Sequence, residues 1–469
     1  MFGPSFQMQK RMYMAQTTGP KMPPGIPYII GNEAAERFSF YGMRAILVVF
    51  MTKYLLNMEG QPDYMTEPQA REWFHFFVSA VYFFPIFGSI LSDVFWGKYK
   101  TILNLSIVYC LGHLALAIGD MHILFPPKIW LGIGLGLIAI GSGGIKPCVS
   151  AHVGDQFNKN TGSLLDKVFG IFYFAINFGA FFSTLLIPLL LDKHGPAVAF
   201  GLPGILMFVA TVVFWMGRNK FHAVPPAGWQ KLKQDAFSSK GLKLLLRLSG
   251  IYLFITVFWS LYDQTGSSWV LQAEKMNRMV DLRFGPIQWE WLRFEVLSSQ
   301  IQAVNPILIL IYIPLFAYFI MPIISKYIKV TSLRKIGVGF FVAALSFAII
   351  AFVETRIGAG EQPSIWWQVL AYIVITSAEV LISITALEFS YTQAPNSMKS
   401  IIMALYLLSV SLGNTVTALI NRFIQNADGT TSLAGASYYW FFTGLVSAAG
   451  ILFIFAAIAY KEETYIQEH

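Results

Sequence analysis

Charged residues are scarce in this sequence. Asp, Glu, Lys and Arg make up 12% of its 469 residues, whereas soluble globular proteins have about 25%. Apolar residues amount to 55%, and the mean hydropathy is +0.57. So few charges cannot cover a water-facing surface, which excludes a soluble globular protein and indicates that most of the exterior faces lipid. The net charge of +8 could suit nucleic acid, but the basic residues lie in short loops between apolar runs, which disfavours that partner.

Cysteine is also rare. Cys110 and Cys148 both lie within apolar stretches, so we interpret them as packing residues rather than a disulfide. The polar segment from Met1 to Pro24 has no short apolar run followed by a cleavage site, so we expect no signal peptide. No metal site or cofactor is predicted.

Apolar runs recur along the whole chain. A membrane helix needs about 20 mostly apolar residues. Windows of that size predict twelve spans, near 28–56, 72–96, 101–121, 129–152, 167–191, 200–217, 246–272, 300–325, 333–354, 366–390, 399–424 and 437–460. Six spans on each side of a polar divider is the layout of major facilitator transporters, whose two related halves surround a central site. A receptor or a membrane enzyme could also have many spans.

The basic residues orient these spans. With the N-terminus inside, roughly nineteen Lys and Arg fall on the cytoplasmic side and ten outside. We therefore expect a cytoplasmic N-terminal segment (1–27), an N-terminal six-helix bundle (28–217), a cytoplasmic linker (218–245), a C-terminal bundle (246–460) and a cytoplasmic tail (461–469).

The first span carries four ionisable side chains, which are costly at membrane depth. At 100° per residue, Glu33, Arg37 and Arg44 share a face, with Tyr41 beside them and Glu36 about 60° from Glu33. A structural ion-pair ladder is the simpler interpretation. Two cations against two anions also suit a site that binds a zwitterion and exchanges a proton.

Lys146 adds a third cation, within the run from Gly141 to Cys148. The glycines permit close helix packing. A phosphate-binding loop is the rival interpretation, but the order G-x-x-x-x-G-K-[ST] is absent. Lys146 requires a carboxylate partner, and Glu33 or Glu36 is the predicted one.

The second half has its own polar residues inside spans. They are Asp263, Asn305 and Glu379. A substrate with separated charges could therefore lie between the halves. Its carboxylate would pair with Arg37, Arg44 or Lys146, because guanidinium binds carboxylate bidentately. Its amino group would bind Glu379, aided by Asn305 and Asn177.

Histidine and aromatic residues give weaker signals. His75 opens the second span on the same face as Tyr82. It is either a hydrogen-bonded structural residue or a proton relay. Tyr173 stands four residues before Asn177, and Trp259 four before Asp263, a spacing that places each aromatic ring beside a polar group on one helix face.

Four stretches resemble one family, the proton-dependent oligopeptide transporters of the major facilitator superfamily. They are Glu33-Ala-Ala-Glu-Arg37, Gly143 to Phe157, Phe172 to Gly179, and Glu379 to Pro395. The run from Gly88 to Lys100 also fits the superfamily's loop between helices two and three, so Gly88, Asp93, Gly97 and Lys98 are expected to act in gating or structure. The similarity extends from about residue 28 to 460.

The resemblance implies roles at the matching positions. It assigns proton coupling to the set Glu33, Glu36, Arg37, Lys146, His75 and Asp263, with Asp263 pairing with Arg44 or the histidine at the outer gate. It assigns substrate binding to Arg44, Lys146, Asn177, Asn305 and Glu379. To this set we add the aromatic residues that lie beside polar or charged groups, namely Tyr41, Tyr82, Tyr173 and Trp259. The chain departs from the family at Phe40, where a tyrosine is usual, so one hydroxyl of the pocket is missing.

The predicted function is therefore proton-coupled import of di- and tripeptides by alternating access, by an all-α membrane protein with twelve transmembrane helices in two bundles. The partners are peptides, protons and the lipid bilayer. We expect a monomer in a plasma membrane, with a bacterial inner membrane favoured by the compact loops. The alternatives are nitrate, amino acids or peptide-like drugs as substrate, and a peptide receptor without transport. A membrane hydrolase is disfavoured because H-E-x-x-H and G-x-S-x-G are absent.

Overall fold

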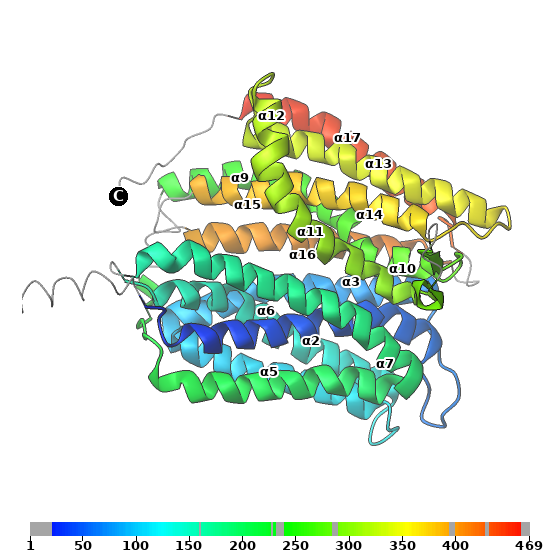
Figure 1. Ribbon diagram of the computed structural model, residues 1–469, viewed down its shortest axis with the longest axis horizontal. Helices are drawn as coiled ribbons and strands as arrows, with labels where there is room; N and C mark the ends of the chain where they lie inside the picture. Colours follow the sequence, from blue (N-terminus) through cyan, green and yellow to red (C-terminus); the bar gives the residue numbers. More distant parts are fainter. Residues whose placement is uncertain are drawn as a thin grey trace, which may run out of the picture.

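The protein is an elongated bundle of long helices, shown in Figure 1 as a computed structural model. The structure describes residues 21–158, 161–226, 228–230, 239–283, 289–393, 399–426 and 431–460. Most of the predicted N-terminal segment, the centre of the predicted linker and the predicted tail lie outside these residues. We call the end of the bundle with Ile26 and Ala459 the proximal end, and the opposite end, with Lys53 and Ala273, the distal end.

The N-terminal part consists of helices that run between the two ends. In chain order they are α2 (Ile26–Lys53), α3 (Glu67–Phe83), α4 (Pro85–Ile90), the π-helix η1 (Leu91–Trp96), α5 (Lys98–Gly119), α6 (Pro127–Asp155), η2 (Gly162–Leu164), α7 (Leu165–Met216) and η3 (Gly217–Asn219). Thr66 begins α3 with a capping box to Gln69, which satisfies backbone N–H groups at the helix start. Pro85 begins α4, because proline has no N–H to continue the helix that precedes it.

Helix α7 is two crossings joined at a reversal. Gly195 has φ 79° and ψ 179° within it, a conformation that glycine adopts without steric cost. Ile187, before the reversal, packs on Gly42 in α2, whereas Gly217, after it, lies against Tyr28 at the proximal end. The chain therefore turns back at Gly195.

Twelve crossings result. Among the described residues, ten helices are long and apolar enough to span a membrane, and the one that contains α7 accounts for two crossings. The charged α2, 28 residues long, packs beside α7 and supplies the twelfth.

The C-terminal part has more interrupted helices. They are α9 (Ser239–Tyr262), η4 (Asp263–Gly266), α10 (Ser268–Ala273), η6 (Ser298–Ala303), α11 (Val304–Leu315), η7 (Phe316–Ile320), α12 (Met321–Ser325), α13 (Ser332–Gly358), α14 (Trp366–Glu379), η8 (Val380–Ile384), α15 (Thr385–Thr392), α16 (Lys399–Phe423) and α17 (Ala436–Ala459). A π-helix follows Glu379, and such bulges are frequent at functional sites.

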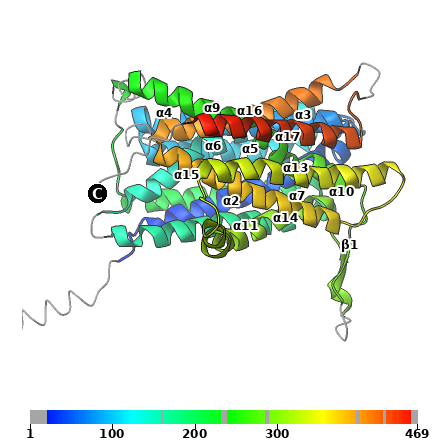
Figure 2. The same cartoon turned by 90° about the horizontal axis from the view of Figure 1, so that it is seen from above.

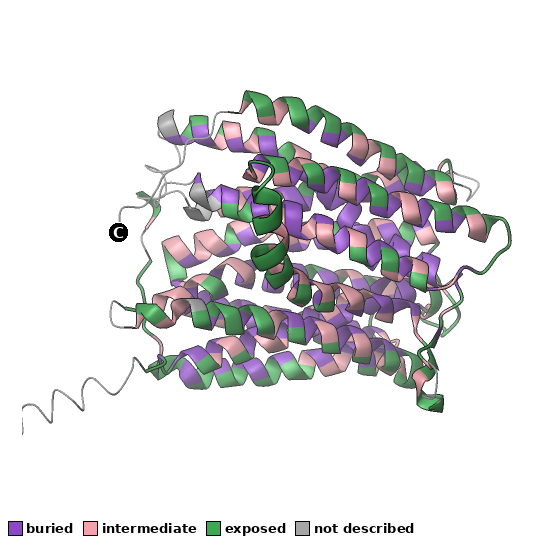
Figure 3. Cartoon of the chain, turned by 45° about the horizontal axis from the view of Figure 1, so that its top comes forward, coloured by how far each residue is buried: buried purple, intermediate pink, exposed green. Residues whose placement is uncertain are grey.

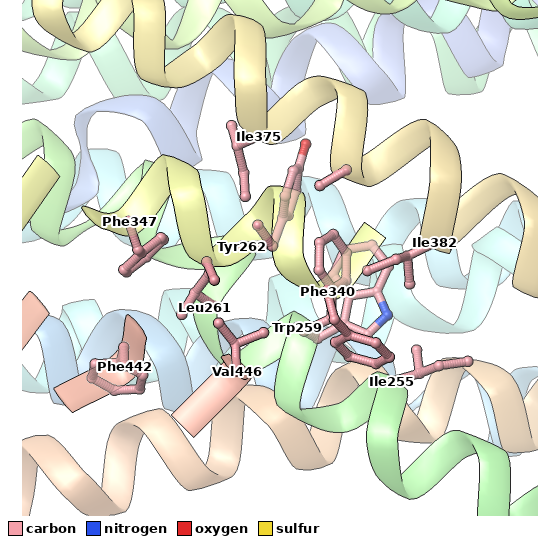
Figure 4. Close-up of a cluster of buried hydrophobic side chains, with 14 of the residues drawn as sticks. Ile255, Trp259, Leu261, Tyr262, Phe340, Phe347, Ile375, Ile382, Phe442 and Val446 are labelled. Carbon is pink, nitrogen blue, oxygen red and sulfur yellow. The ribbon is translucent and has the colours of Figure 1, made fainter. Parts of the chain in front are cut away.

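Two hydrophobic cores hold these helices together. One extends from Ile26 to Phe214 and includes Val270 and Leu271 of α10. The other extends from Leu244 to Phe453, and Figure 4 shows part of it, with aromatic rings from α9, α13 and α17 packed together. Exposed residues cover much of the outer helix surface in Figure 3, and many of them are large and apolar, as expected for contact with lipid. Both cysteines are free, which confirms that they form no disulfide.

A small hairpin interrupts the helices at the distal end. Strands β1 (Met279–Asp281) and β2 (Arg293–Glu295) pair antiparallel, with the short helix η5 (Glu290–Leu292) before β2. Figure 2 shows the hairpin projecting sideways from the bundle. The helix that follows it, from Ser298 to Ser325, has only 6% of its apolar window buried and crosses in front of the bundle in Figure 1.

Candidate functional site

Three charged side chains of α2 form a buried cluster in the N-terminal core. Arg37 Nε lies 2.7 Å from Glu33 Oε1 and 2.9 Å from Glu36 Oε2. Glu36 is fully buried, and its Oε1 accepts a hydrogen bond of 2.5 Å from Ser142 Oγ on α6. Both carboxylates therefore face the same guanidinium nitrogen, whose hydrogen bond goes to Glu33. With two carboxylates and one fixed cation, the cluster becomes neutral when it binds one proton.

The prediction that Lys146 forms an ion pair with Glu33 or Glu36 is wrong. Its Nζ lies 4.0 Å from the centre of the Tyr82 ring and 4.6 Å from that of Phe40. No carboxylate oxygen of the described residues lies within 4.0 Å of it. Arg37 shares a helix with both glutamates and reaches them first, so the ammonium is held between ring faces, a favourable arrangement for a cation. Phe40, the departure from the family pattern, supplies one of these faces.

Arg44 crosses to the C-terminal part. Its Nη2 lies 2.6 Å from Asp263 Oδ1 in η4. The other oxygen of Asp263 accepts a hydrogen bond of 2.7 Å from Asn414 Nδ2 on α16. Asn414 Oδ1 lies 2.7 Å from His75 Nδ1, and His75 Nε2 lies 2.9 Å from Ser267 Oγ. A continuous chain of polar contacts therefore joins Arg44 to His75.

Glu379 is held by two neutral donors. Tyr262 Oη donates to Glu379 Oε2 at 2.7 Å, and Asn305 Nδ2 donates to the same oxygen at 2.8 Å. Asn305 also bonds Thr376 Oγ1 at 3.1 Å. No basic group of the described residues lies within 4.0 Å of this carboxylate, so it can receive a cation from outside the protein.

A cavity of about 210 Å³ brings these groups together between the two cores. Arg44 lines it from the N-terminal part and Glu379 from the C-terminal part. The other lining residues are mostly polar or aromatic: Tyr41, Tyr82, Tyr173, Ile176, Asn177, Ala180, Thr184, Tyr262, Asp263, Thr265, Gln302, Asn305, Pro306, Ile309 and Tyr372. Opposite charges contributed by the two parts of the chain suit a solute with separated charges.

The cavity collects most of the residues predicted to bind substrate. Seven line it: Tyr41, Arg44, Tyr82, Tyr173, Asn177, Asn305 and Glu379. Lys146 and Trp259 do not. Trp259 packs against Phe258 and Tyr262 in the C-terminal core, where Figure 4 labels Trp259 and Tyr262. Asn177 Nδ2 donates to the backbone oxygen of Tyr173. Of the predicted proton-coupling residues, Asp263 lines the cavity, whereas Glu33, Glu36, Arg37 and His75 are buried outside its lining.

The predicted gating residues lie near the proximal end. A Cβ on Gly88 would approach Gly144 Cα in α6 to 2.6 Å, so α4 and α6 touch there. Gly97 has φ 74°, which ends η1 with a turn. Lys98 Nζ lies 2.6 Å from Asp155 Oδ2, and Asp93 O accepts a hydrogen bond from the backbone of Gly228.

Several site residues escaped sequence reasoning. Ser142, Tyr262, Ser267 and Asn414 are uncharged, and such residues are common in membrane helices. Asn414 stands in the run from Ser409 to Thr417, whose polar residues could have indicated a buried seam.

The two parts contact each other through their distal halves. Eleven hydrogen-bonded or ion-paired contacts between described residues join Ile26–Met216 to Ser239–Ala459 there, and we call this set the distal seam. Its members are Arg44–Asp263, Lys53–Glu274, Glu67–Lys275, Glu72–Arg422, Glu72–Gln425, His75–Ser267, His75–Asn414, Ser79–Ser411, Ser79–Thr415, Ala45–Gln302 and Leu185–Gln300. The cavity is therefore closed toward the distal end.

The chain matches characterised proteins along most of its length. A model of the POT family matches residues 99–238 and 229–441. Solute carrier family 15 member 2 of Rattus norvegicus is 36% identical, over 79% of this chain and 54% of its own length. Peptide transporter family 1 of Drosophila melanogaster is 37% identical, over 71% of this chain and 48% of its own length. The chain thus spans about half the length of these curated relatives.

Solved structures agree in fold. The POT family transporter PepTSo is 36% identical, with a TM-score of 0.82 over 94% of this chain and 99% of its own. An auto-inhibited POT family peptide transporter is 32% identical, with a TM-score of 0.83 over 95% and 99%. These matches confirm the predicted major facilitator fold of two helical bundles. The chain belongs to the POT family, as its motifs predicted.

Proposed function

We propose that this protein is a proton-coupled symporter that imports di- and tripeptides. The observation that carries the proposal is the cavity between the two cores, which Arg44 of the N-terminal part and Glu379 of the C-terminal part both line. A short peptide is a zwitterion whose charged ends are separated by its backbone, so it can satisfy both residues at once. Membership of the POT family supports this assignment.

The peptide would bind with its ends oriented by charge. Its carboxylate would bind Arg44, the cation of the N-terminal part that lines the cavity, with Lys146 behind the lining ring of Tyr82. Its amino group would bind Glu379 and take the place of the Tyr262 and Asn305 hydrogen bonds. Asn177 would bind the peptide backbone, while Tyr41, Tyr82 and Tyr173 give a roomy aromatic wall that tolerates different side chains.

Proton coupling would use the two buried clusters. The Glu33–Glu36–Arg37 cluster can accept one proton as counted above, and His75 can accept another at the distal seam. A peptide carboxylate on Arg44 competes with Asp263 for the guanidinium. Peptide and proton binding therefore weaken contacts that close the distal end, which lets the bundles 28–217 and 246–460 rock around the cavity.

We place the distal end on the outer face of a plasma membrane, a bacterial inner membrane by the compactness of the loops. Both termini and the linker 218–245 would then be cytoplasmic, and the closed distal seam would correspond to an inward-facing state. Transport of this kind requires no covalent chemistry and no cofactor, so we propose that the protein is not an enzyme. The two bundles of a single chain line the cavity together, so we propose that a monomer suffices.

Three alternatives remain distinct in their predictions. Nitrate needs no amine-binding carboxylate, so Glu379 would be superfluous in a nitrate transporter. An amino acid or a peptide-like drug would bind the same two charged residues, Arg44 and Glu379, and would therefore compete with dipeptides. A receptor would bind peptide without accumulating it.

The deciding experiment is uptake of a labelled dipeptide into liposomes that contain the purified protein, with and without an inward proton gradient. We expect accumulation above equilibrium only with the gradient. Glu36→Gln should lose this accumulation but retain gradient-free exchange of peptide, because it removes a protonatable group and leaves Arg44 and Glu379 intact. Glu354→Gln, the same change in a buried carboxylate of the other core, should accumulate peptide normally.

Two outcomes would overturn the assignment. Folded protein that moves no dipeptide under either condition would reject peptide as the substrate. Accumulation by Glu36→Gln equal to that of the unmodified protein would reject Glu36 as a coupling residue.

A further inference from the structure

Asn414 of α16 occupies a position between two ionisable groups that come from different parts of the chain. Its side chain contacts His75 of α3 on one side and Asp263 of η4 on the other, both at 2.7 Å. All three residues are buried, with exposed fractions of 0% for Asn414 and His75 and 2% for Asp263. A buried amide between an imidazole and a carboxylate constrains the position of the imidazole hydrogen.

The orientation of the amide follows from its neighbours. Asp263 is paired with Arg44 and is an acceptor, so the amide group that faces it must be the donor, Nδ2. Val410 O lies 3.0 Å from the same nitrogen and also requires a donor. The reverse orientation would place the amide oxygen against two acceptor oxygens. Asn414 Oδ1 therefore faces His75.

This orientation determines where the hydrogen of His75 lies. A neutral imidazole carries one hydrogen, on Nδ1 or on Nε2. Asn414 Oδ1 can only accept, so the hydrogen must be on Nδ1. Nε2 is then an acceptor, and Ser267 Oγ, at 2.9 Å, donates to it. Ser267 lies at the junction of η4 and α10, with φ −129° and ψ −85°, where the helix is interrupted.

The charged groups around the ring leave Nε2 as the side for proton uptake. Arg44 of α2 and Arg71 of the same helix α3 are the cations near His75, and Asp263 of η4 is the nearby anion, reached through Asn414. Helix α16 contributes only the neutral Asn414 at this contact. Arg71 stacks on the Tyr438 ring at 4.4 Å rather than on His75. Nδ1 is already protonated, so a further proton must bind Nε2.

We propose that Asn414 is a positioning residue that fixes neutral His75 with its hydrogen on Nδ1, so that the transported proton binds at Nε2. Proton uptake then forms an N–H bond at Nε2, and the Ser267 hydroxyl must rotate from donor to acceptor. The proton leaves from the same atom when the hydroxyl returns. Protonation of His75 thereby changes the hydrogen bond of Ser267 at the junction of η4 and α10. The step from tautomer to transport rests on the proposed symport, whereas the tautomer itself does not.

Nitrogen NMR of protein labelled with ¹⁵N-histidine tests the tautomer directly. His75→Gln identifies the His75 signals by their loss. In the unmodified protein, at a pH where the ring is neutral, Nδ1 should give the signal of a protonated nitrogen and Nε2 that of an unprotonated one. The opposite pattern would overturn the proposal, and this measurement needs no variant of Asn414 that folds.

Asn414→Leu, similar in size but without hydrogen bonds, tests the cause. Its His75 should lose the preference for hydrogen on Nδ1. Thr415→Val is the matched control, because it removes the Thr415–Ser79 bond across the same seam without touching His75. An unchanged pattern in Asn414→Leu, or the same change in Thr415→Val, would show that the amide does not set the tautomer.

Transport gives the functional readout. Gradient-driven accumulation of dipeptide by Asn414→Leu should fall about tenfold, as for the loss of a buried hydrogen bond to a charged group, while the peptide concentration for half-maximal exchange stays within about twofold. A pH profile of uptake identical to that of the unmodified protein would overturn the proposed coupling role. If the unmodified protein moves no peptide, the proposed function fails, and the NMR result still decides the tautomer.

Discussion

At the scale of single residues, the cluster on α2 shows how one guanidinium can determine the pairing of its whole surroundings. Arg37 binds both Glu33 and Glu36 and leaves Lys146 to the rings of Tyr82 and Phe40. Both contacts are made by Nε, and lysine carries a carbon at that position of its side chain, with its compact ammonium one atom further out. The arginine at position 37 is therefore required for the double pairing, not only for its charge.

We predict that Arg37→Lys destabilises the protein by about 3 kcal/mol, the low end of the range for breaking a buried ion pair. One of the two glutamates would lose its partner in a buried site. The measurement is thermal unfolding in detergent. Arg356→Lys, in an exposed pair with Glu361, is the control and should change stability by less than about 1 kcal/mol. Equal effects of the two changes would contradict the assigned role of Arg37.

Outside the membrane-spanning segments, Glu274 gives the distal seam a dependence on pH. Burial raises the pKa of this carboxyl, but hydrogen bonds from Lys53 and Ser298 outweigh burial and hold the pKa below its ordinary value of 4.5. A lowered pKa in the folded protein stabilises it at pH values above 4.5, and this stabilisation is lost as the pH falls further.

We therefore expect Glu274→Gln to lower thermal stability near neutral pH. At a pH well below 4.5, the variant and the unmodified protein should be equally stable. Melting curves of the two proteins across this range should converge in acid. A constant difference at every pH would show that the ionised carboxylate contributes nothing.

At the scale of helices, the sequence predicted positions well and interruptions poorly. The spans expected at 101–121 and 129–152 correspond to α5 (Lys98–Gly119) and α6 (Pro127–Asp155). Hydropathy averages over about 19 residues, so it could not show the break of α9 at Asp263 or the π-helix after Glu379. The site followed the same pattern. Charged residues were found because they are rare in apolar spans, whereas Asn414 and Tyr262 depend on partners that only the packed helices bring together.

The contact between α4 and α6 depends on the absence of a side chain at Gly88. We predict that Gly88→Ala costs about 1–3 kcal/mol, as overpacking does, because the new Cβ would collide with the backbone of Gly144. The midpoint temperature of thermal unfolding and the rate of dipeptide uptake should both fall. Gly136→Ala in α6 is the control, since its Cβ would meet no atom within 4 Å, and it should be neutral or slightly stabilising. A neutral Gly88→Ala would mean that the helices can separate without cost.

At the scale of the whole molecule, two cores meet through the distal seam and enclose the cavity. Each core is contiguous within its own part, apart from Val270 and Leu271 of α10, which pack into the N-terminal core. Beside this apolar packing of α10, the seam consists of ion pairs and polar contacts between side chains. Polar contacts can be exchanged for contacts with water or substrate, so a seam of this composition can open and reclose.

Cross-linking tests whether the seam must open. Ser79 Oγ lies 2.7 Å from Thr415 Oγ1, so Ser79→Cys with Thr415→Cys should form a disulfide when Cys110 and Cys148 are replaced by Ala. We expect oxidation to abolish dipeptide uptake and reduction to restore it. Ser79→Cys alone should be insensitive to oxidant. Uptake that persists in the cross-linked protein would contradict alternating access through this seam.

The closed distal seam also makes the two faces of the protein unequal as targets. A compound or antibody fragment that fills the cavity of this state must arrive from the proximal end, because Arg44–Asp263 and its neighbours close the other route. In sealed vesicles of one orientation, such a ligand would act from one compartment and be inert in the other. A binder selected against the projecting strands β1 and β2 would have the opposite sidedness. The two binders together would report which face of the protein is exposed on a vesicle.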